Sequence, residues 1–423
     1  MSTSLDTSAF LPAYDAASPE NQVKLLYAWL ATKPLELYAE LRSQRPILVS
    51  PGPVLLTRFA DVEEALSRNL VFTVRPYAPK MDPSVGPFML ARDGTVYNQR
   101  DKGILRALIQ QSDMDGVRAQ VAALAKTAIA EGASSDGRLE IVSQLTRLVP
   151  VRLTGAYFGF SGPDDATMMR WSYATQNDMF HNLTDDPAIH QANLEAGREM
   201  FIYLNNILPG RRQRVASDPK ADDIVSRLLR LETPPSIGFD QARLLSNIMG
   251  LLVGGVETTS AAAVQAIDVL LDRPGPLAQA ITAAKLNDLA TFDRLFWEAL
   301  RFWPMNPFIV RQSVAAYTIA AGTERETTLP ANSLVLCATA SAMHDATVVK
   351  NPEAFDPNRP AYHYLHFGYG EHVCLGDQVS LQQTPELARQ VFLAGYTKRA
   401  EGPAGRPDFK GGSFPESLTL VRG

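Results

Sequence analysis

Residues 366–376 combine side chains that could hold a metal beside a flat ligand, and they read HFGYGEHVCLG. Cys374 is one of two cysteines in the chain, and it could bind a metal as a thiolate because a metal lowers the pKa of a thiol. The glycines of this loop would let the backbone turn sharply and pass close to a ligand. Phe367 and His372 would add an aromatic face and a cationic or hydrogen-bonding group. The simpler alternative is a buried structural cysteine after a glycine-rich turn.

A second chemical feature is an acid beside an alcohol within a long hydrophobic segment. Residues 239–272 are predicted to form one helix, and we expect it to be buried because it is hydrophobic on nearly every side. Its centre, residues 254–259, reads GGVETT. This sequence disfavours a helix, since each glycine costs about 1 kcal/mol relative to alanine and the threonines are β-branched. Such a local conflict is typical of a functional site.

The same residues could carry out proton chemistry. Gly254 and Gly255 would let a flat cofactor or a small diatomic molecule approach the backbone. Thr258 could donate a hydrogen bond to a preceding carbonyl and loosen the helix. Glu257 supplies an ionisable group next to it, so the two side chains could form a proton relay. The alternative is a glycine-containing packing face with one buried glutamate.

The composition excludes several classes of protein. A chain of 423 residues with 46% hydrophobic and 20% charged residues is typical of a globular protein with a large core. The net charge of −5 and the lack of a long basic tract argue against a nucleic-acid partner. Two cysteines make no disulfide framework, which favours the cytoplasm. We expect no membrane anchor, because the longest apolar run, residues 248–256, is too short to cross a bilayer.

The periodicity of apolar residues predicts a mainly helical fold with a small β-rich region. A β-hairpin is expected over residues 45–59, and short strands are expected within residues 316–336. Residues 71–93 are rich in proline and lack periodicity, so we expect an irregular segment there. Further helices are expected at residues 23–42 (divided at Pro34), 60–67, 100–109, 116–132, 139–160, 163–178, 188–214 and 293–303. One more helix is expected after Cys374, where Pro385 interrupts it.

The cysteine loop spells FxxGxxxCxG through Phe367, Gly370, Cys374 and Gly376, and it resembles the haem-binding loop of the cytochrome P450 superfamily, of the soluble bacterial type. Three other motifs of that family occur in the expected order. They are the GGxxTT-type oxygen-binding groove at residues 254–259, the ExxR pair Glu298 and Arg301, and the sequence FDPNRP at residues 355–360.

The resemblance implies the cytochrome P450 fold over residues 25–423 as one domain, preceded by a poorly ordered extension of residues 1–24. In that fold, a triangular helical prism, haem b lies between the long central helix and the cysteine loop. Cys374 would be the proximal iron ligand, and Glu257 and Thr258 would deliver protons to iron-bound dioxygen.

The resemblance also assigns the other haem contacts. The haem propionates would be bound by Lys102, Arg106, Arg311 and His372. Lys102 departs from the family, which usually has a histidine at this position. Other residues would contact the haem through the loop and the groove: Gly254, Gly255, Phe367, Gly368 and Gly376.

Two further sets of residues follow from the resemblance. A buried charge network would fix the cysteine loop, and it would comprise Glu298, Arg301 and Arg359. Removal of one member of such a network costs about 3 to 5 kcal/mol. The substrate pocket would be lined by Phe72, Phe88, Phe180, Pro307 and Phe308.

The implied activity is that of a monomeric monooxygenase that inserts one atom of O2 into a small apolar substrate. Electrons from NAD(P)H would arrive through a ferredoxin or flavodoxin and its reductase. Leu381 and Gln383 stand where most members have an arginine and a glutamate on the helix after Cys374, so the surface offered to a redox partner departs from that of the family. Two alternatives stay open: a peroxide-driven or rearranging haem-thiolate enzyme, and a non-catalytic haem sensor or binding protein. Terpenoids, small aromatic molecules and polyketide-like molecules are the substrate classes left open.

Overall fold

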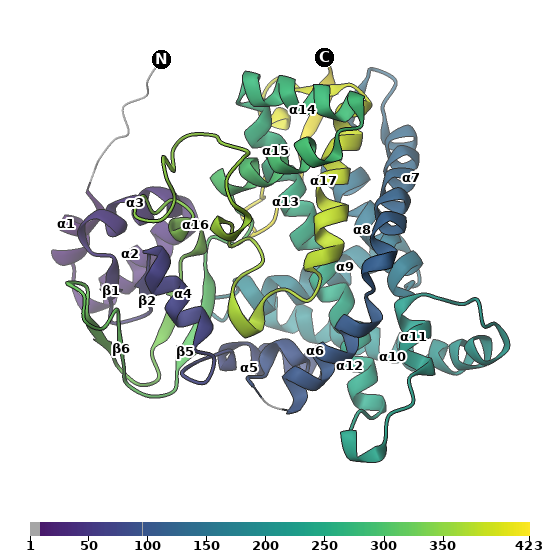
Figure 1. The fold of residues 1–423 in the computed structure, drawn as a ribbon, viewed down its shortest axis with the longest axis horizontal. Coiled ribbons are helices and arrows are strands. Elements are labelled where there is room, and N and C mark those ends of the chain that lie inside the picture. Colours follow the sequence, from purple (N-terminus) through teal and green to yellow (C-terminus); the bar gives the residue numbers. More distant parts are fainter. Residues whose placement is uncertain (1–8, 95) are drawn as a thin grey trace. The chain divides into compact units, whose positions relative to one another are not determined.

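The computed structural model describes residues 9–94 and 96–423, which group into two compact units. The first unit comprises the residues up to 76 together with 306–354 and 359–373. Its elements, labelled in Figure 1 where there is room, are α1 (Phe10–Asp15), α2 (Pro19–Thr32), α3 (Pro34–Gln44), β1 (Ile47–Val49), β2 (Val54–Leu56), α4 (Phe59–Ser67), β3 (Phe72–Thr73), β5 (Ile309–Ser313), β6 (Tyr317–Ile319), β7 (Thr327–Leu329), β8 (Leu334–Cys337), α16 (Thr339–Ala342), η8 (Ala361–His363) and η9 (Gly370–His372).

The first unit is built on a five-stranded sheet with the strand order β1-β2-β8-β5-β3. The predicted β-hairpin is confirmed, since β1 and β2 pair antiparallel with Ile47 opposite Leu56. β8 runs parallel to β2 and antiparallel to β5. β6 and β7 form a separate two-stranded sheet.

The second unit comprises residues 77–305, 355–358 and 374–423. A three-stranded sheet in the order β4-β10-β9 accompanies its helices. Its elements are α5 (Ala78–Val85), η2 (Met89–Ala91), α6 (Val96–Leu108), η3 (Gln111–Asp113), α7 (Met114–Gly132), β4 (Arg138–Glu140), η4 (Val142–Thr146), α8 (Leu148–Leu153), η5 (Thr154–Phe158), α9 (Asp165–Gln176), η6 (Asn177–His181), α10 (Pro187–Ser217), α11 (Ile224–Arg230), η7 (Pro235–Ile237), α12 (Gln241–Gly255), α13 (Glu257–Leu271), α14 (Pro274–Leu286), α15 (Leu289–Phe302), α17 (Asp377–Leu393), β9 (Tyr396–Arg399), η10 (Pro403–Gly405) and β10 (Thr419–Arg422); the short helix η1 (Arg75–Tyr77) bridges the two units in sequence.

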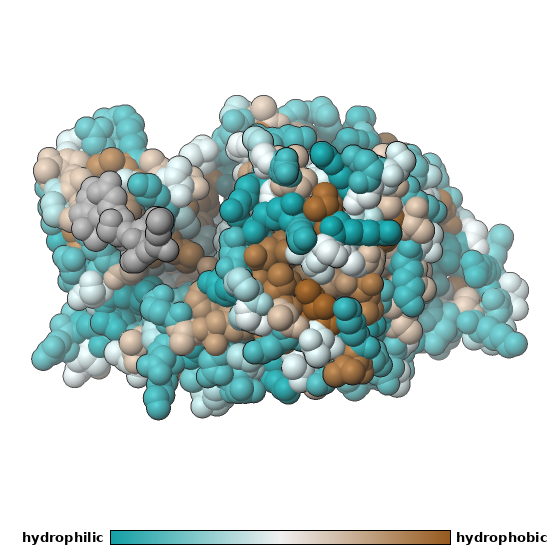
Figure 2. Space-filling view, turned by 90° about the horizontal axis from the view of Figure 1, so that it is seen from above, coloured by the Kyte–Doolittle hydropathy of each residue, from teal (hydrophilic) through white to brown (hydrophobic). Residues whose placement is uncertain are grey.

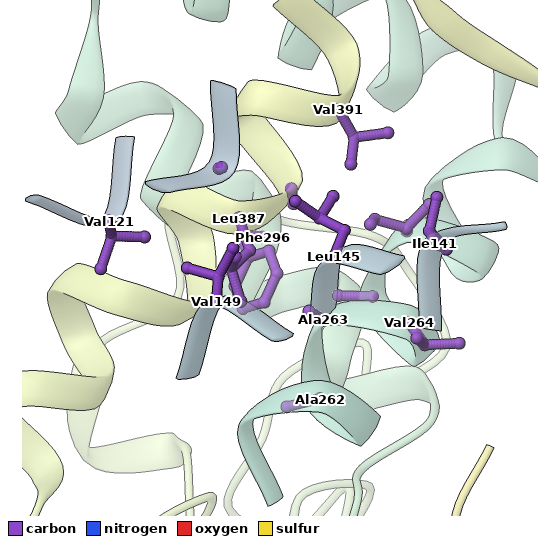
Figure 3. Packing of buried hydrophobic residues seen from close by; sticks show 14 of the residues in the cluster. Val121, Ile141, Leu145, Val149, Ala262, Ala263, Val264, Phe296, Leu387 and Val391 are labelled. Carbon is purple, nitrogen blue, oxygen red and sulfur yellow. The ribbon is translucent and has the colours of Figure 1, made fainter. Parts of the chain in front are cut away.

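The core of the second unit surrounds α13. Figure 3 shows Ala262, Ala263 and Val264 of this helix near Leu145 of η4 and Val149 of α8. α13 also packs against α15 and α17. Small side chains on α13 let these neighbours approach closely, so burial of apolar surface fixes the helix in place.

The prediction of one continuous helix over residues 239–272 is wrong in one respect. The helix is interrupted at Val256, whose φ of −109° and ψ of −68° separate α12 from α13. The interruption falls directly after the glycine pair, where the helix is locally least favourable. Residues 241–271 are long and apolar enough to cross a membrane, but 83% of that hydrophobic window is buried in the protein, as expected of a core helix. Figure 2 shows a face on which hydrophilic residues surround a group of hydrophobic residues.

Residues 139–160 also differ from the single helix that we predicted. The segment begins with the strand β4 and continues through two π-helical turns, η4 and η5, on either side of α8. Each π-helical turn shifts the helix face that follows it. Apolar periodicity alone does not reveal such shifts.

Two helices that contain prolines also differ from the prediction. The segment expected to be irregular, residues 71–93, contains α5, in which one proline occupies the first turn and Pro83 lies inside the helix. α17 continues through Pro385, because the helix packs against α7 and α13 and this packing outweighs a local cost of about 3 kcal/mol.

The extension predicted over residues 1–24 is partly helical. Residues 1–8 lie outside the described part of the chain. α1 begins at Phe10, and its first backbone N–H groups at Phe10 and Leu11 donate to the carboxylate of Glu40 at 2.8 and 2.7 Å. This remote carboxylate satisfies N–H groups that have no partner within the helix. The extent of the domain, residues 25–423, stays a prediction.

Candidate functional site

Cys374 lies shortly before α17, which begins at Asp377 in the second unit, and it has accessible surface. The backbone N–H of Gly376 bonds to its sulfur and lowers the pKa of the thiol, and Lys102 and Arg106 act in the same direction. Desolvation by the surrounding protein is larger, so the pKa of Cys374 is raised overall. Cys374 thus has accessible surface although many protein atoms surround its thiol.

Arg106 of α6 contacts Cys374 and the start of α17 within the second unit. Its Nη2 donates to the carbonyl oxygen of Cys374 at 3.0 Å and lies 3.5 Å from Asp377 Oδ2. Lys102, one turn earlier on the same helix, is half-buried. No group of three or more His, Cys, Asp and Glu side chains in the described residues could hold a metal, so Cys374 is not part of such a group.

The loop that leads to Cys374 turns as the glycines predict. Gly368 and Gly370 have positive φ angles of 76° and 73°. A Cβ on Gly370 would lie 2.6 Å from the carbonyl oxygen of Leu66, which real side chains do not tolerate. Glycine is therefore required there by both conformation and space. Phe367 and His372 are half-buried within the first unit.

The junction of α12 and α13 has accessible surface in an otherwise buried helix pair. Gly254 is exposed, and a Cβ built on it would meet no described atom within 4 Å. Thr258 Oγ1 donates to the carbonyl oxygen of Gly254 at 2.8 Å, which confirms the predicted bond to a preceding carbonyl. Gly255 and Thr258 are half-buried, so these three residues present a small accessible strip.

Glu257 points into the protein, where it is fully buried and ion-paired with Arg147 of the segment between η4 and α8. Arg147 Nε lies 2.8 Å from Glu257 Oε2, and Arg147 also pairs with Glu416 at 2.9 Å. The other carboxylate oxygen of Glu257 has no hydrogen-bond partner among the described residues. Burial raises the pKa of Glu257 to about 7, although Arg147 opposes the rise.

Arg147 and Glu416 are site residues that we did not predict. Arg147 also stacks over the ring of Tyr173, 5.4 Å from its centroid. A lone arginine in an apolar segment and a glutamate near the C-terminus carry no motif. Only the buried glutamate, which requires a partner, could have suggested that a cation lies nearby.

Arg311 of β5 is a buried cation in the first unit. Its Nη1 donates to the carbonyl oxygen of Val310 at 2.9 Å, and its Nε has no hydrogen-bond partner in the described part of the chain. A buried guanidinium is unfavourable without a counter-charge. Arg311 therefore has the capacity to bind an anion.

The predicted ExxR pair forms a buried ion pair. Arg301 Nη2 lies 2.8 Å from Glu298 Oε1, and both side chains have no exposed surface. The backbone N–H of Asp356 donates to the same carboxylate at 2.9 Å. In the first unit, Arg359 donates to the carbonyl oxygens of Lys350, Asn351 and Ala354. Its membership of one network with the pair stays a prediction.

The residues predicted to line a substrate pocket are distributed over both units. In the second unit, Phe88 packs so closely on α12 that a Cβ on Gly250 would lie 2.2 Å from its ring, and Phe180 lies 5.3 Å from Tyr77. In the first unit, Pro307 and Phe308 are half-buried. Phe72 is fully buried and packs against Tyr317, a core position without accessible surface.

Comparison with known proteins identifies the family to which these features belong. The family model described as cytochrome P450 matches residues 164–385. The vitamin D(3) 25-hydroxylase of Pseudonocardia autotrophica is 28% identical over 85% of this chain and 88% of its own. The mycinamicin IV hydroxylase/epoxidase of Micromonospora griseorubida is 24% identical over 84% of this chain and 86% of its own.

Solved structures show the same fold. CYP109E1 from Bacillus megaterium, solved in complex with testosterone, superimposes with a TM-score of 0.77 at 19% sequence identity. The match covers 96% of this chain and 100% of that chain. The predicted mainly helical fold with a small β-rich region is confirmed.

Proposed function

The chain belongs to the cytochrome P450 family, and from that premise we propose that Cys374 is the axial ligand of its haem and that Glu257 and Thr258 manage protons during oxygen insertion. Members of this family are haem-dependent monooxygenases, and the relatives named above hydroxylate or epoxidise organic molecules. The accessible thiol that accepts a bond from the Gly376 N–H is the observation that carries the proposal.

The residues present fit a haem. A thiolate, an anion-binding cation and a glycine surface are the groups that such a cofactor requires. Within the second unit, Cys374 supplies the accessible thiol and Gly254 leaves open space beside the helix backbone. Within the first unit, Arg311 supplies a buried guanidinium with an unpartnered Nε. Bound haem would supply the activation of O2.

The other residues would hold the cofactor. We assign the propionates to Lys102, Arg106, Arg311 and His372. Lys102 keeps a cation where the family usually has histidine, and both cations of α6 lower the pKa of the thiol. We assign contacts with the haem ring or its ligand loop to Gly254, Gly255, Phe367, Gly368 and Gly376.

Two side chains on the distal helix would handle protons. The hydroxyl of Thr258 is bound to the Gly254 carbonyl but can still accept a hydrogen bond. Glu257 has a pKa of about 7, so its carboxyl group exchanges a proton readily near neutral pH. Arg147 would set the direction of that carboxylate.

The family and the surface of α17 support a proposal for the electron supply. Bacterial members generally receive electrons from a ferredoxin and a reductase, and we propose that this chain takes electrons originating from NAD(P)H through a ferredoxin or flavodoxin. Leu381 is 40% exposed and Gln383 is buried on α17, so only Leu381 could contact a partner directly. We also propose a monomer in the cytoplasm.

The substrate class is a small apolar organic molecule. Relatives that act on vitamin D(3) and mycinamicin IV support a lipophilic substrate. Terpenoids, small aromatic molecules and polyketide-like molecules are compatible with the predicted apolar lining by Phe88, Phe180, Pro307 and Phe308.

Reconstitution with isotopically labelled O2 tests the proposed function. The purified protein is incubated with a ferredoxin, its reductase, NADPH and a compound that shifts the ferric spectrum. We expect one labelled oxygen atom in the product and none without NADPH. Product formed only with added hydrogen peroxide would favour the peroxide-driven alternative, and a thiolate-type spectrum without any product would favour a sensor.

A further inference from the structure

Arg147 divides its guanidinium between two carboxylates of the second unit. Its Nε donates one bond to Glu257 Oε2 at 2.8 Å. Its two Nη atoms donate to the two carboxylate oxygens of Glu416 at 2.9 and 3.1 Å. Nη2 also donates to the carbonyl oxygen of Pro415 at 3.1 Å. The forked end of the guanidinium, which binds a carboxylate with two parallel bonds, is therefore directed at the C-terminal segment and away from the distal helix.

This division leaves the distal acid with only one of its two oxygens bound. Glu257 Oε1 is buried and has no hydrogen-bond partner among the described residues. A buried carboxylate needs a cation to compensate its charge, and Glu416 competes with Glu257 for the same cation. Burial raises the pKa of Glu257 to about 7, Arg147 opposes the rise, and the negative charge of Glu416 adds to it. A proton taken up by Glu257 therefore belongs on Oε1, the oxygen that Arg147 does not bind.

The backbone around Glu416 fixes the place of the competing carboxylate. The N–H groups of Glu416 and Ser417 donate to the carbonyl oxygen of Asp408 at 2.7 and 3.2 Å, and Asp408 and Ser417 form a β-bridge. The side chain of Glu416 is 22% exposed, whereas that of Glu257 has no exposed surface. Water therefore stabilises the charge of Glu416 better than the charge of Glu257, which makes Glu257 the acid that takes up a proton.

Tyr173 of α9 is a further titratable group beside this acid. Arg147 stacks over its ring, 5.4 Å from the centroid. Burial raises the pKa of Tyr173, the negative charges of Glu416 and Glu257 raise it further, and Arg147 opposes the rise. The phenol is therefore neutral near pH 7, so Arg147 and Glu416 are the charges that act on Glu257.

We propose that Glu416 is a positioning residue for proton delivery, because it holds the fork of Arg147 and thereby leaves Oε1 of Glu257 to carry a proton. The proposal rests on the proton role proposed above for Glu257 and Thr258, and it names the residue that regulates this role. Without the charge of Glu416, Arg147 would compensate Glu257 alone. The acid would then stay ionised near neutral pH, where it should exchange a proton.

Infrared titration of Glu257 tests this proposal on the purified holoenzyme. The C=O absorption of protonated carboxyl groups is recorded over a series of pH values, and the spectra of Glu257→Gln are subtracted to isolate the band of this acid. We expect half of the band to be lost near pH 7 in the unaltered protein. In Glu416→Gln the same half-loss should occur about one pH unit lower, since a like charge beside Glu257 is removed.

Two further variants separate the charge of Glu416 from its contribution to structure. Glu416→Asp keeps the negative charge, so we expect a much smaller shift than in Glu416→Gln. Asp165→Asn removes a carboxylate that pairs instead with Arg152 at 3.1 Å, so the band should titrate as in the unaltered protein. The proposal is overturned if no band of Glu257 appears, if Glu416→Gln titrates as the unaltered protein does, or if either control variant shifts the band equally.

The ferrous carbon monoxide spectrum tests the proposed function separately, because it depends on the thiolate of Cys374 and not on Glu416. A thiolate-type spectrum together with an unshifted infrared titration contradicts only the role of Glu416. A shifted titration in a protein without that spectrum contradicts only the haem assignment.

Discussion

Arg147 Nε lies 2.8 Å from Glu257 Oε2 although 110 residues separate the two in sequence. The pair is almost completely buried, and Glu257 directly precedes Thr258, the proposed distal alcohol. Arg147 also forms an ion pair with Glu416, so one guanidinium connects the start of α13 with the C-terminal segment. The proposed proton donor is thus held by a part of the chain that carries no recognisable motif.

Replacement of Arg147 tests this arrangement. Arg147→Leu leaves Glu257 buried without a cation, so we expect the free energy of unfolding to fall by about 3 to 5 kcal/mol. Arg152→Leu is the matched control, because Arg152 pairs with Glu131 at 3.4 Å and Asp165 at 3.1 Å nearer the surface and should cost about 1 kcal/mol or less. Urea unfolding of both variants measures the difference. Equal losses would show that the Arg147 pair contributes nothing beyond a surface pair.

Stability should also depend on pH through Glu257. Its pKa is about 7 in the folded protein and about 4.5 in the unfolded chain. Between these values the folded state retains a proton that the unfolded state has lost, so the free energy of unfolding should fall as pH rises, by about 3 kcal/mol in total. Urea unfolding at several pH values measures this decline, and Glu257→Gln should remove it. A decline that persists in Glu257→Gln would assign it to another group.

The buried pair Glu298 and Arg301 should be required for haem retention. Glu298→Gln replaces the carboxylate that pairs with Arg301 by a neutral amide, and it keeps only one of the two oxygens that accept from Arg301 and from the Asp356 N–H. We expect a loss of about 3 to 5 kcal/mol in the free energy of unfolding, together with a lower haem content. Glu20→Gln is the control, since Glu20 forms an exposed pair with Lys24 at 2.6 Å. A fully haem-loaded, stable Glu298→Gln protein would contradict a structural role for the pair.

Thr258→Ala should separate oxygen consumption from product formation. The variant loses the accessible hydroxyl but should still bind haem, so NAD(P)H oxidation should yield hydrogen peroxide instead of product. Thr259→Ala is a matched control, because Thr259 makes the equivalent bond to the Gly255 carbonyl at 3.0 Å but is buried. The ratio of product to NAD(P)H oxidised is measured for both. Unchanged coupling in Thr258→Ala would remove the threonine from the proton path.

The sequence revealed the parts of the site that depend on short-range spacing. The cysteine loop, the acid-alcohol pair and the ExxR pair each lie within a few residues, so local sequence predicts their proximity. The Gly370 turn and the Thr258 bond follow from the intrinsic conformational preferences of these residues.

Features that depend on tertiary packing could not be predicted in the same way. Arg147 meets Glu257 only because the π-helical turn η4 and α13 pack together. α17 passes through Pro385 because burial stabilises the helix.

Replacement of Cys374 tests the central assignment most directly, with Cys337→Ala as the control. Cys337 is the other cysteine of the chain, fully buried with its pKa raised to about 12, and so cannot readily supply a thiolate. The measurement is the absorption spectrum of the ferrous carbon monoxide complex. We expect the thiolate-type spectrum to persist in Cys337→Ala and to disappear in Cys374→Ala; its survival in Cys374→Ala would contradict the assignment of Cys374 as the haem ligand.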